Sequence, residues 1–378
     1  MSDRRMGFPS MSCLRFVFAW TAALCCPFFL AQIVVAQDTD ESIVSRHLRL
    51  HIPAERQWIG RDNISDLERC WEFVHVAAGG QLPSRVSVVI EWQDAATSVD
   101  AERSTITLGM NDPSALKDSN GFLLQIAVRG LARLALTNLM GDGASKPENR
   151  FLLDGMSEML AHEFSNTVKR LGAAWTICHY VDKISPLGLM HLSGRSEFAG
   201  DSQDLVAAAP GITFLTFCSE VYGRDRVLKL FDSLAQKNLE DSLAAAFKTR
   251  VPALETQWLN RVRGYDPQEF SISPDEPGPA LDRVLFNPEP AKPGAALAVR
   301  LYTHQGRSYL GSTGIFLIDE SSGKTRQGHQ VKPTEGMFTQ FEIPVESARQ
   351  DGKYRVHIVA VDNGGNVCIW EASYTVTR

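Results

Sequence analysis

Apolar and polar residues alternate in three short stretches of the first third of the chain. Residues 45–52, 86–92 and 104–108 have this period of two, which is typical of half-buried β-strands. Between the first two stretches, residues 63–78 repeat their apolar positions at helical spacing. The pattern predicts a small sheet whose first two strands are connected by a helix.

From residue 120 the apolar positions recur every three or four residues. This period is typical of amphipathic helices. The predicted helices cover residues 120–140, 148–170, 204–222, 225–236 and 251–263. A small sheet followed by helices indicates an α+β domain over residues 42–263.

Prolines cluster after residue 263, where the helical period ends. The cluster holds seven of the 18 prolines: Pro267, Pro274, Pro277, Pro279, Pro288, Pro290 and Pro293. We expect a Pro-rich linker over residues 264–283. The segments that follow it have strand character and cover residues 296–302, 314–319, 338–345, 353–361 and 367–376. They predict an all-β sandwich over residues 284–378.

One of these predicted strands has a well-defined pair of faces. Val356, Ile358 and Ala360 share one face, and Arg355, His357 and Val359 share the other. The residues that follow, 362–366, read Asp-Asn-Gly-Gly-Asn and suit a hairpin turn, although their oxygen atoms would also suit Ca²⁺. This ending resembles the last hairpin of the bacterial immunoglobulin-like or fibronectin-type modules appended to exported proteins, and the resemblance implies an accessory binding or spacer domain.

The first 36 residues resemble a secretory signal. Arg4, Arg5 and Arg15 precede an uncharged apolar stretch, and Val34 and Ala36 place small residues where a signal peptidase cleaves. We expect residues 1–36 to be removed and the protein to be secreted or periplasmic. The stretch is also long enough to serve as an uncleaved membrane anchor.

Composition and charge narrow the partners. The chain is 44% hydrophobic and 22% charged, values typical of folded protein, and its formal net charge is −6 without a basic block. Nucleic acid is therefore not an expected partner. Four cysteines lie beyond the signal segment, too far apart for a CxxC metal clip: Cys70, Cys178, Cys218 and Cys368. Export would permit a disulfide without indicating which pair, and we favour small buried thiols.

The helices predicted around residues 122–136 and 150–161 carry the most informative pattern. Together they resemble the peptidase MA family, the gluzincin-type zinc metalloproteases, in which HExxH on one helix is followed by a third zinc ligand on the next. The resemblance places the two histidine positions on Arg129 and Arg133, the general base on Gly130 and the third ligand on Asp154. It continues through residues 210–223, 227–234 and 254–258, and so covers residues 42–263 of this zincin-like domain.

These substitutions remove the chemistry of the family. A guanidinium group has no lone pair for a metal ion, and Gly130 has no carboxylate to accept a proton from water. We therefore expect no catalytic residue, no metal ligand and no cofactor. The resemblance then implies an exported, catalytically inactive pseudoprotease that binds a peptide or protein, with an extended peptide added along the edge of the sheet.

The two arginines lie four residues apart and share one helix face. They would clamp the two helices through ion pairs with Asp154, and Glu158 is a second partner one turn further on. The alternative is that both side chains extend to solvent from a surface helix and make no contact between helices. Two other functions stay open: an anion or small-molecule site built on Arg129, Arg133 and Glu158, and a hydrolase with relocated catalytic residues.

Four other motifs resemble sites less well. His47 and His51 are spaced like metal ligands, but we interpret them as exposed histidines on a strand. The pair Cys178 and His179 cannot form a dyad because neighbouring residues on a helix diverge by about 100°. Ser157 lacks the second glycine of a nucleophile elbow. His162-Glu163 begins HExxH but is followed by Asn166 where the second histidine belongs.

Overall fold

The computed structural model describes most of the chain from Ser42 to Arg378. The described residues are 42–91, 97–109, 120–165, 168–184, 187–189, 205–266, 280–304, 314–319, 324–327, 329–331, 338–361 and 367–378. The predicted signal segment, most of the predicted linker and the predicted turn at 362–366 lie outside these residues.

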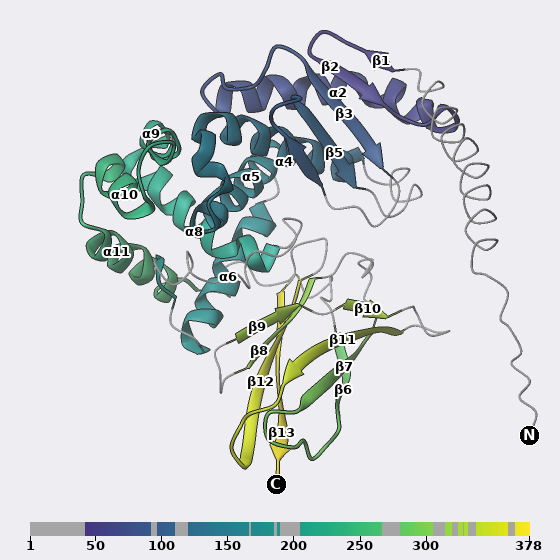
Figure 1. The fold of residues 1–378 in the computed structure, drawn as a ribbon, viewed down its shortest axis with the longest axis vertical. Coiled ribbons are helices and arrows are strands. Elements are labelled where there is room, and N and C mark those ends of the chain that lie inside the picture. Colours follow the sequence, from purple (N-terminus) through teal and green to yellow (C-terminus); the bar gives the residue numbers. More distant parts are fainter. Residues whose placement is uncertain are drawn as a thin grey trace, which may run out of the picture.

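A mixed five-stranded sheet, here called sheet A, forms the N-terminal part of the fold (Figure 1). Its strands, in spatial order, are β1 (Ile43–Val44), β2 (Leu48–His51), β3 (Val86–Glu91), β5 (Thr105–Gly109) and β4 (Ser98–Asp100). The three central strands are parallel, and both edge strands are antiparallel to their neighbours. The strand predicted over 45–52 is β2 together with the turn that precedes it, and the two edge strands β1 and β4 were not predicted.

One face of sheet A is buried beneath helices. The alternation predicted from sequence places Leu50, Val88 and Ile106 side by side across the parallel strands, and each is fully buried. Helix α2 (Gln57–Ala77) makes the crossover between β2 and β3 and packs on this face together with α4 (Asn120–Met140). Because one face of each of these strands and helices is buried, their apolar residues recur with a regular period, and the order of a strand, a helix and further strands could be predicted from it.

The remaining helices follow sheet A in the chain. They are α5 (Arg150–Ser165), α6 (Val168–Ile184), α8 (Leu205–Tyr222), α9 (Arg224–Leu234), α10 (Leu239–Phe247) and α11 (Val251–Arg263). The single helix predicted over 148–170 is two helices, and α10 was missed. Its start is set by Asn238, whose side chain accepts a hydrogen bond from the backbone N–H of Asp241 at 2.8 Å.

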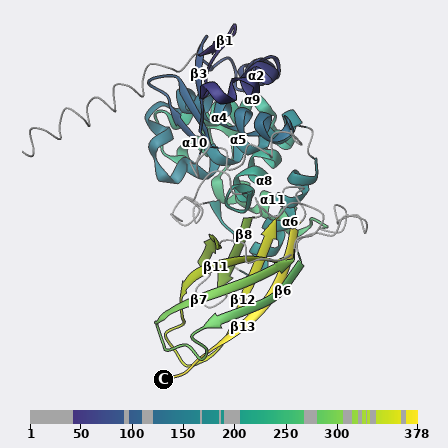
Figure 2. The ribbon, with the colours of Figure 1, turned by 90° about the vertical axis from the view of Figure 1, so that its right-hand side faces the viewer.

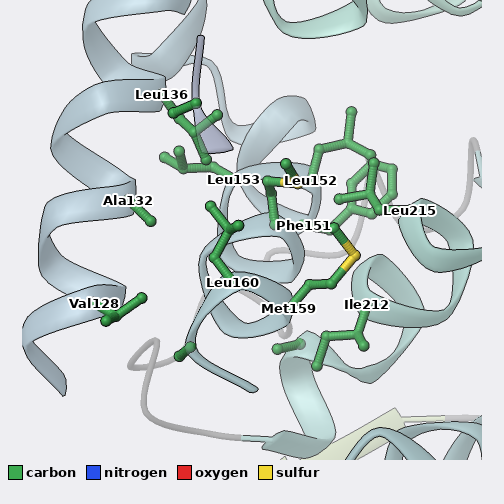
Figure 3. Packing of buried hydrophobic residues seen from close by; sticks show 14 of the residues in the cluster. Val128, Ala132, Leu136, Phe151, Leu152, Leu153, Met159, Leu160, Ile212 and Leu215 are labelled. Atoms are coloured by element: carbon green, nitrogen blue, oxygen red, sulfur yellow. The ribbon is translucent and has the colours of Figure 1, made fainter. Parts of the chain in front are cut away.

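Helices α4, α5 and α8 share an apolar seam, and together with α6 they are called the helical layer below. Figure 3 shows Val128, Ala132 and Leu136 on α4 facing side chains of α5. Spacing of four residues keeps these three on one stripe of the helix. On the far side of α5, Ile212 and Leu215 of α8 complete the seam.

The C-terminal β-domain, residues 280–378, consists of two four-stranded antiparallel sheets. Sheet B has the order β10 (His329–Val331), β11 (Phe338–Glu346), β7 (Ala296–His304) and β6 (Ala280–Asn287). Sheet C has the order β13 (Val367–Val376), β12 (Gly352–Val361), β8 (Gly314–Asp319) and β9 (Lys324–Gln327). The five predicted strands are confirmed, whereas β6, β9 and β10 were missed. Strand β6 begins inside the segment predicted as linker.

Both sheets contribute to one core, which includes Val299 and Ile343 of sheet B and Ile358 of sheet C. Figures 1 and 2 place sheet A at one end of the molecule, the helices in the middle and the β-domain at the other end. The chain thus has mixed α and β structure, with a small sheet and helices preceding two further small sheets.

One segment among the described residues, Leu123–Ser145, is long and apolar enough to cross a membrane by length and composition. Of its apolar 18-residue window, 67% is buried inside the structure. Burial of this extent is typical of the core helix of a globular domain.

Candidate functional site

The four charged residues singled out in the sequence meet between two neighbouring helices. Arg129 and Arg133 lie on α4. Each directly follows a residue of the apolar stripe in Figure 3, Val128 and Ala132, so the two arginines form a second stripe beside it. Asp154 and Glu158 lie one turn apart on α5. Because α4 and α5 pack along their lengths, each arginine faces a carboxylate.

Arg133 forms an ion pair with Asp154. Nη2 of Arg133 donates a hydrogen bond to Oδ1 of Asp154, and the two side chains are 12% and 6% exposed. Arg150, at the start of α5, approaches the other carboxylate oxygen of Asp154 with its Nε at 3.5 Å. Its side chain is 40% exposed, so Asp154 joins the largely buried Arg133 to a more exposed arginine.

Arg129 forms the second pair, with Glu158. Nη2 of Arg129 donates to Oε2 of Glu158 at 2.9 Å, and Nε of Arg129 lies against Oε1. One hydrogen bond and a second close contact between opposite charges therefore join Arg129 to Glu158. His162, one turn further along α5, places Nε2 3.7 Å from Oε2 of Glu158.

The Arg129–Glu158 pair is more deeply buried than the Arg133–Asp154 pair. The Arg129 and Glu158 side chains are 6% and 2% exposed.

Burial raises the pKa of Asp154 above its ordinary value, and the neighbouring Arg133 guanidinium offsets part of that effect. Removing one member of such a pair strands a charge away from water, so the pairs hold the relative positions of α4 and α5.

Gly130, which lies between the two arginines on α4, faces sheet A. A methyl group on Gly130 would lie 3.3 Å from side-chain atoms of both Ile106 and Leu108 on β5. Glycine therefore allows α4 to approach the sheet closely. A glutamate at this position would have to displace the core.

The residues at this place do not fit the zinc ion that the peptidase resemblance implies. Two of the three ligand positions hold guanidinium groups, which stay protonated and offer no lone pair. The carboxylate at the third position is bound by arginine. Among the residues that the structure describes, no group of three His, Cys, Asp or Glu side chains is placed to hold a metal ion.

The structure gives two of the remaining candidates structural contacts. Ser157 is 1% exposed and donates to the carbonyl of Leu153 at 2.8 Å. Cys178 contacts the hydroxyl of Thr213 at 3.4 Å, whereas His179 donates from Nδ1 to the carbonyl of Val262 at 3.0 Å. Cysteine and histidine thus point to different partners, as their adjacent positions on a helix require.

The prediction for His47 was wrong. It lies in the turn between β1 and β2, its side chain is 13% exposed, and Nδ1 donates to Glu68 of α2 at 2.8 Å. The ring stacks on Trp71 with centroids 3.8 Å apart, and the ring of His75 also stacks on Trp71, with centroids 4.6 Å apart. Sequence reasoning missed this cluster because it depends on a residue 21 positions further along the chain.

The same cluster determines the charge of Glu68. Burial by itself raises the pKa of this carboxyl, but it accepts hydrogen bonds from the Ser45 hydroxyl and from the backbone and ring of His47. Their combined effect holds the pKa of Glu68 below its ordinary value. A carboxylate fixed in this way fastens the β1–β2 hairpin to α2.

Of Cys70, Cys178, Cys218 and Cys368, the first three behave as small core residues. Burial raises the pKa of Cys70 and of Cys178 to about 12, and it also raises that of Cys218. Cys368 is partly exposed, and all four are free thiols.

Comparisons with known proteins give no family for this chain. No family model matches it, and no curated protein matches it. A comparison with solved structures aligns the chain with the alkylpurine DNA glycosylase AlkC of Pseudomonas fluorescens, bound to DNA containing an abasic site analogue. The two sequences are 10% identical. That alignment covers 86% of this chain and 100% of the glycosylase chain with a TM-score of 0.20, a value too low to carry an argument.

Proposed function

We propose that the protein is an exported, catalytically inactive relative of the peptidase MA metalloproteases that binds a peptide or protein. In this proposal residues 42–263 have a zincin-like fold, and the C-terminal β-domain is an immunoglobulin-like sandwich. The proposal extends the α+β layout of sheet A and the helices, and the two-sheet layout of the C-terminal domain.

The observation that carries the proposal is the pairing of the two arginines across α4 and α5. The peptidase resemblance aligns Arg133 with a metal ligand on one helix and Asp154 with a metal ligand on the next, and these two side chains are in contact. Residues that share a metal ion in an active enzyme must converge on one point, and the side chains at two of the three aligned positions, Arg133 and Asp154, are in contact. An ion pair between two aligned ligand positions supports a scaffold retained without its metal chemistry.

The same geometry argues against an anion site built on the two arginines. Arg129 and Arg133 each contact a carboxylate already, and both are largely buried. An incoming anion would compete with Glu158 or Asp154 for its hydrogen bonds, so peptide binding elsewhere on the scaffold is the better supported function.

Strand β4 is the part of sheet A best suited to accept a peptide. It is an antiparallel edge strand of three residues, and Ser98 and Asp100 are exposed. Addition of an extended peptide to a sheet edge uses backbone hydrogen bonds and requires no metal ion. Such binding would survive the loss of the zinc ligands.

Two measurements on the purified protein, residues 37–378, test the proposal. Elemental analysis is expected to find far less than one zinc per chain, and casein or a peptide library is expected to remain uncleaved with or without added zinc. Stoichiometric zinc with chelator-sensitive cleavage would overturn it. A peptide library screened for binding is expected to yield ligands, and a chain with no peptide affinity at all would contradict the binding function.

Strand addition is tested by placing proline at either of two neighbouring positions of β4. Successive residues of a strand direct their N–H groups to opposite sides, so one of Ser98→Pro and Val99→Pro removes an outward-facing donor and the other breaks a bond to β5. The variant that keeps the melting temperature of the natural chain is expected to lose peptide binding. Unchanged peptide affinity in that variant would exclude this edge.

A further inference from the structure

Strand β12 of the β-domain is buried on both of its faces over residues 356–360. Five successive residues, from Val356 to Ala360, are each buried to 8% exposure or less. Val356, Ile358 and Ala360 belong to the core between sheets B and C. Val359 points the opposite way and belongs to the core of the N-terminal part of the chain.

The neighbouring strand of sheet C repeats this division. On β8, Leu317 belongs to the core between the two sheets, whereas Ile318 belongs to the N-terminal core, and both are fully buried. On β13, Val367 and Ile369 are partly buried against the same N-terminal core. These four side chains, Ile318, Val359, Val367 and Ile369, are called the outer patch of sheet C.

Helices α6 and α8 lie against this patch. Strand β13 contacts α6, and strand β8 contacts α8. An antiparallel sheet in a two-sheet domain ordinarily turns its outer face to water and carries polar residues there. Apolar residues on that face, fully buried at two positions, therefore indicate a surface adapted to a fixed partner.

The edge of the contact lies beside the outer patch. His357, between Val356 and Ile358 on β12, is 8% exposed on the same face as Val359. Glu371, which lies opposite His357 on the adjacent strand β13, has a side chain that is 63% exposed. Burial thus changes to exposure within one pair of residues, which limits the patch to the part of sheet C nearest the helices.

We infer that the outer patch of sheet C is a docking surface for the helical layer of the same chain, so that the β-domain and the helices form one rigid body. This goes beyond the proposed function, since it holds whether or not the helical part binds peptides. It also revises the expectation that the β-domain is an accessory module joined to the rest of the chain by a Pro-rich linker alone. Truncation at the predicted linker would expose apolar surface on both halves.

The test cuts the complete chain without removing either half. A site for a specific protease is inserted within residues 267–279 of the protein spanning 37–378, and the cleaved sample is analysed by size-exclusion chromatography with light scattering. The two fragments are expected to elute together at the mass of the uncut protein, in 0.1 M and in 1 M NaCl, because an apolar contact is not screened by salt. Elution as two separate, monodisperse fragments would overturn the inference.

A pair of substitutions then locates the contact. Val359→Glu is expected to separate the cleaved fragments, since the outer face of an isolated sheet tolerates a charge that a buried contact does not. Leu285→Glu, on sheet B where the natural leucine is 41% exposed, is the matched control and is expected to leave them together. Co-elution of the Val359→Glu fragments would contradict the assigned surface, and if that variant fails to fold, the cleaved natural chain decides the question.

Discussion

Gly155 of α5 lies directly against Gly211 of α8. A methyl group built on Gly155 would be 2.4 Å from the carbonyl carbon of Gly211, and one built on Gly211 would be 2.0 Å from the carbonyl oxygen of Phe151. Such distances leave no room for any side chain, so the two helices cross backbone to backbone. Gly155 directly follows Asp154, which places this crossing beside the charged pairs of α4 and α5.

Gly155→Ala is therefore expected to destabilise the protein by about 3 kcal/mol, through overpacking at a contact that cannot relax. In an ordinary helix interior the same change would stabilise by up to about 1 kcal/mol, so the predicted sign is opposite to helix propensity. Urea unfolding followed by circular dichroism measures the difference. The control is Gly141→Ala, where the added group meets nothing within 4 Å and only the φ of +52° is unfavourable.

The pair formed by Arg133 and Asp154 predicts a loss of stability on Arg133→Met. We expect a loss of about 3 kcal/mol, at the lower end for a broken buried pair, because Arg150 still lies 3.5 Å from Asp154. The melting temperature should fall by several degrees. An unchanged or higher melting temperature would show that Arg133 is not a clamp between the helices.

Glu68 predicts a pH dependence of stability with a defined sign. Its pKa is lower in the folded chain than in the unfolded chain, so its contribution is present above the ordinary glutamate pKa and is lost as the pH falls through the lower folded value. Glu68→Gln is expected to cost about 1–2 kcal/mol at pH 7 and progressively less below pH 4. Thermal melts at pH 7, 5 and 3 give the comparison. A difference that stays constant over this range would contradict the assignment.

Burial of three thiols predicts selective reactivity. In the protein spanning residues 37–378, Ellman's reagent is expected to modify Cys368 and to leave Cys70, Cys178 and Cys218 unmodified while the chain is folded. Thiolate is the reacting species, and burial both suppresses it and blocks access. All four should react in denaturant. Rapid reaction of more than one thiol in the folded protein would contradict the burial described for these helices.

The features that could be predicted from sequence are those decided by local periodicity. Helix α4 was predicted because its apolar residues recur along one stripe, and Arg129 and Arg133 share a face for the same geometric reason. The contact of Arg133 with Asp154 followed from aligning two helices with a known arrangement. The finding that Arg129 pairs with Glu158 instead of Asp154 depends on how the helices are shifted relative to each other, which periodicity does not determine.

The features that could not be predicted depend on contacts between distant segments. His47 has the spacing of an exposed strand residue, but Trp71 and Glu68 from α2 cover it. The sequence does contain an indication that Val359 is buried. It is an apolar residue on the strand face that would carry polar residues if it were exposed to water. Strand β4 was missed because three residues are too few to show a period.

The deepest charged pair, Arg129 and Glu158, is best examined by a double-mutant cycle, because single substitutions alone cannot separate attraction from the cost of burial. Arg129→Met and Glu158→Met are each expected to destabilise by about 3–5 kcal/mol, since each deprives a buried charge of its closest oppositely charged partner. The double variant, with two apolar side chains of similar length, is expected to recover most of that loss, which corresponds to a coupling energy of several kcal/mol. Its matched control is the same cycle at Arg261 and Glu220, a pair 2.9 Å apart whose side chains are 55% and 49% exposed, for which we expect a coupling of at most about 1 kcal/mol. Additive losses at Arg129 and Glu158 would show that the two residues do not act as a pair, and the site would then lose its principal support as a metal site replaced by ion pairs.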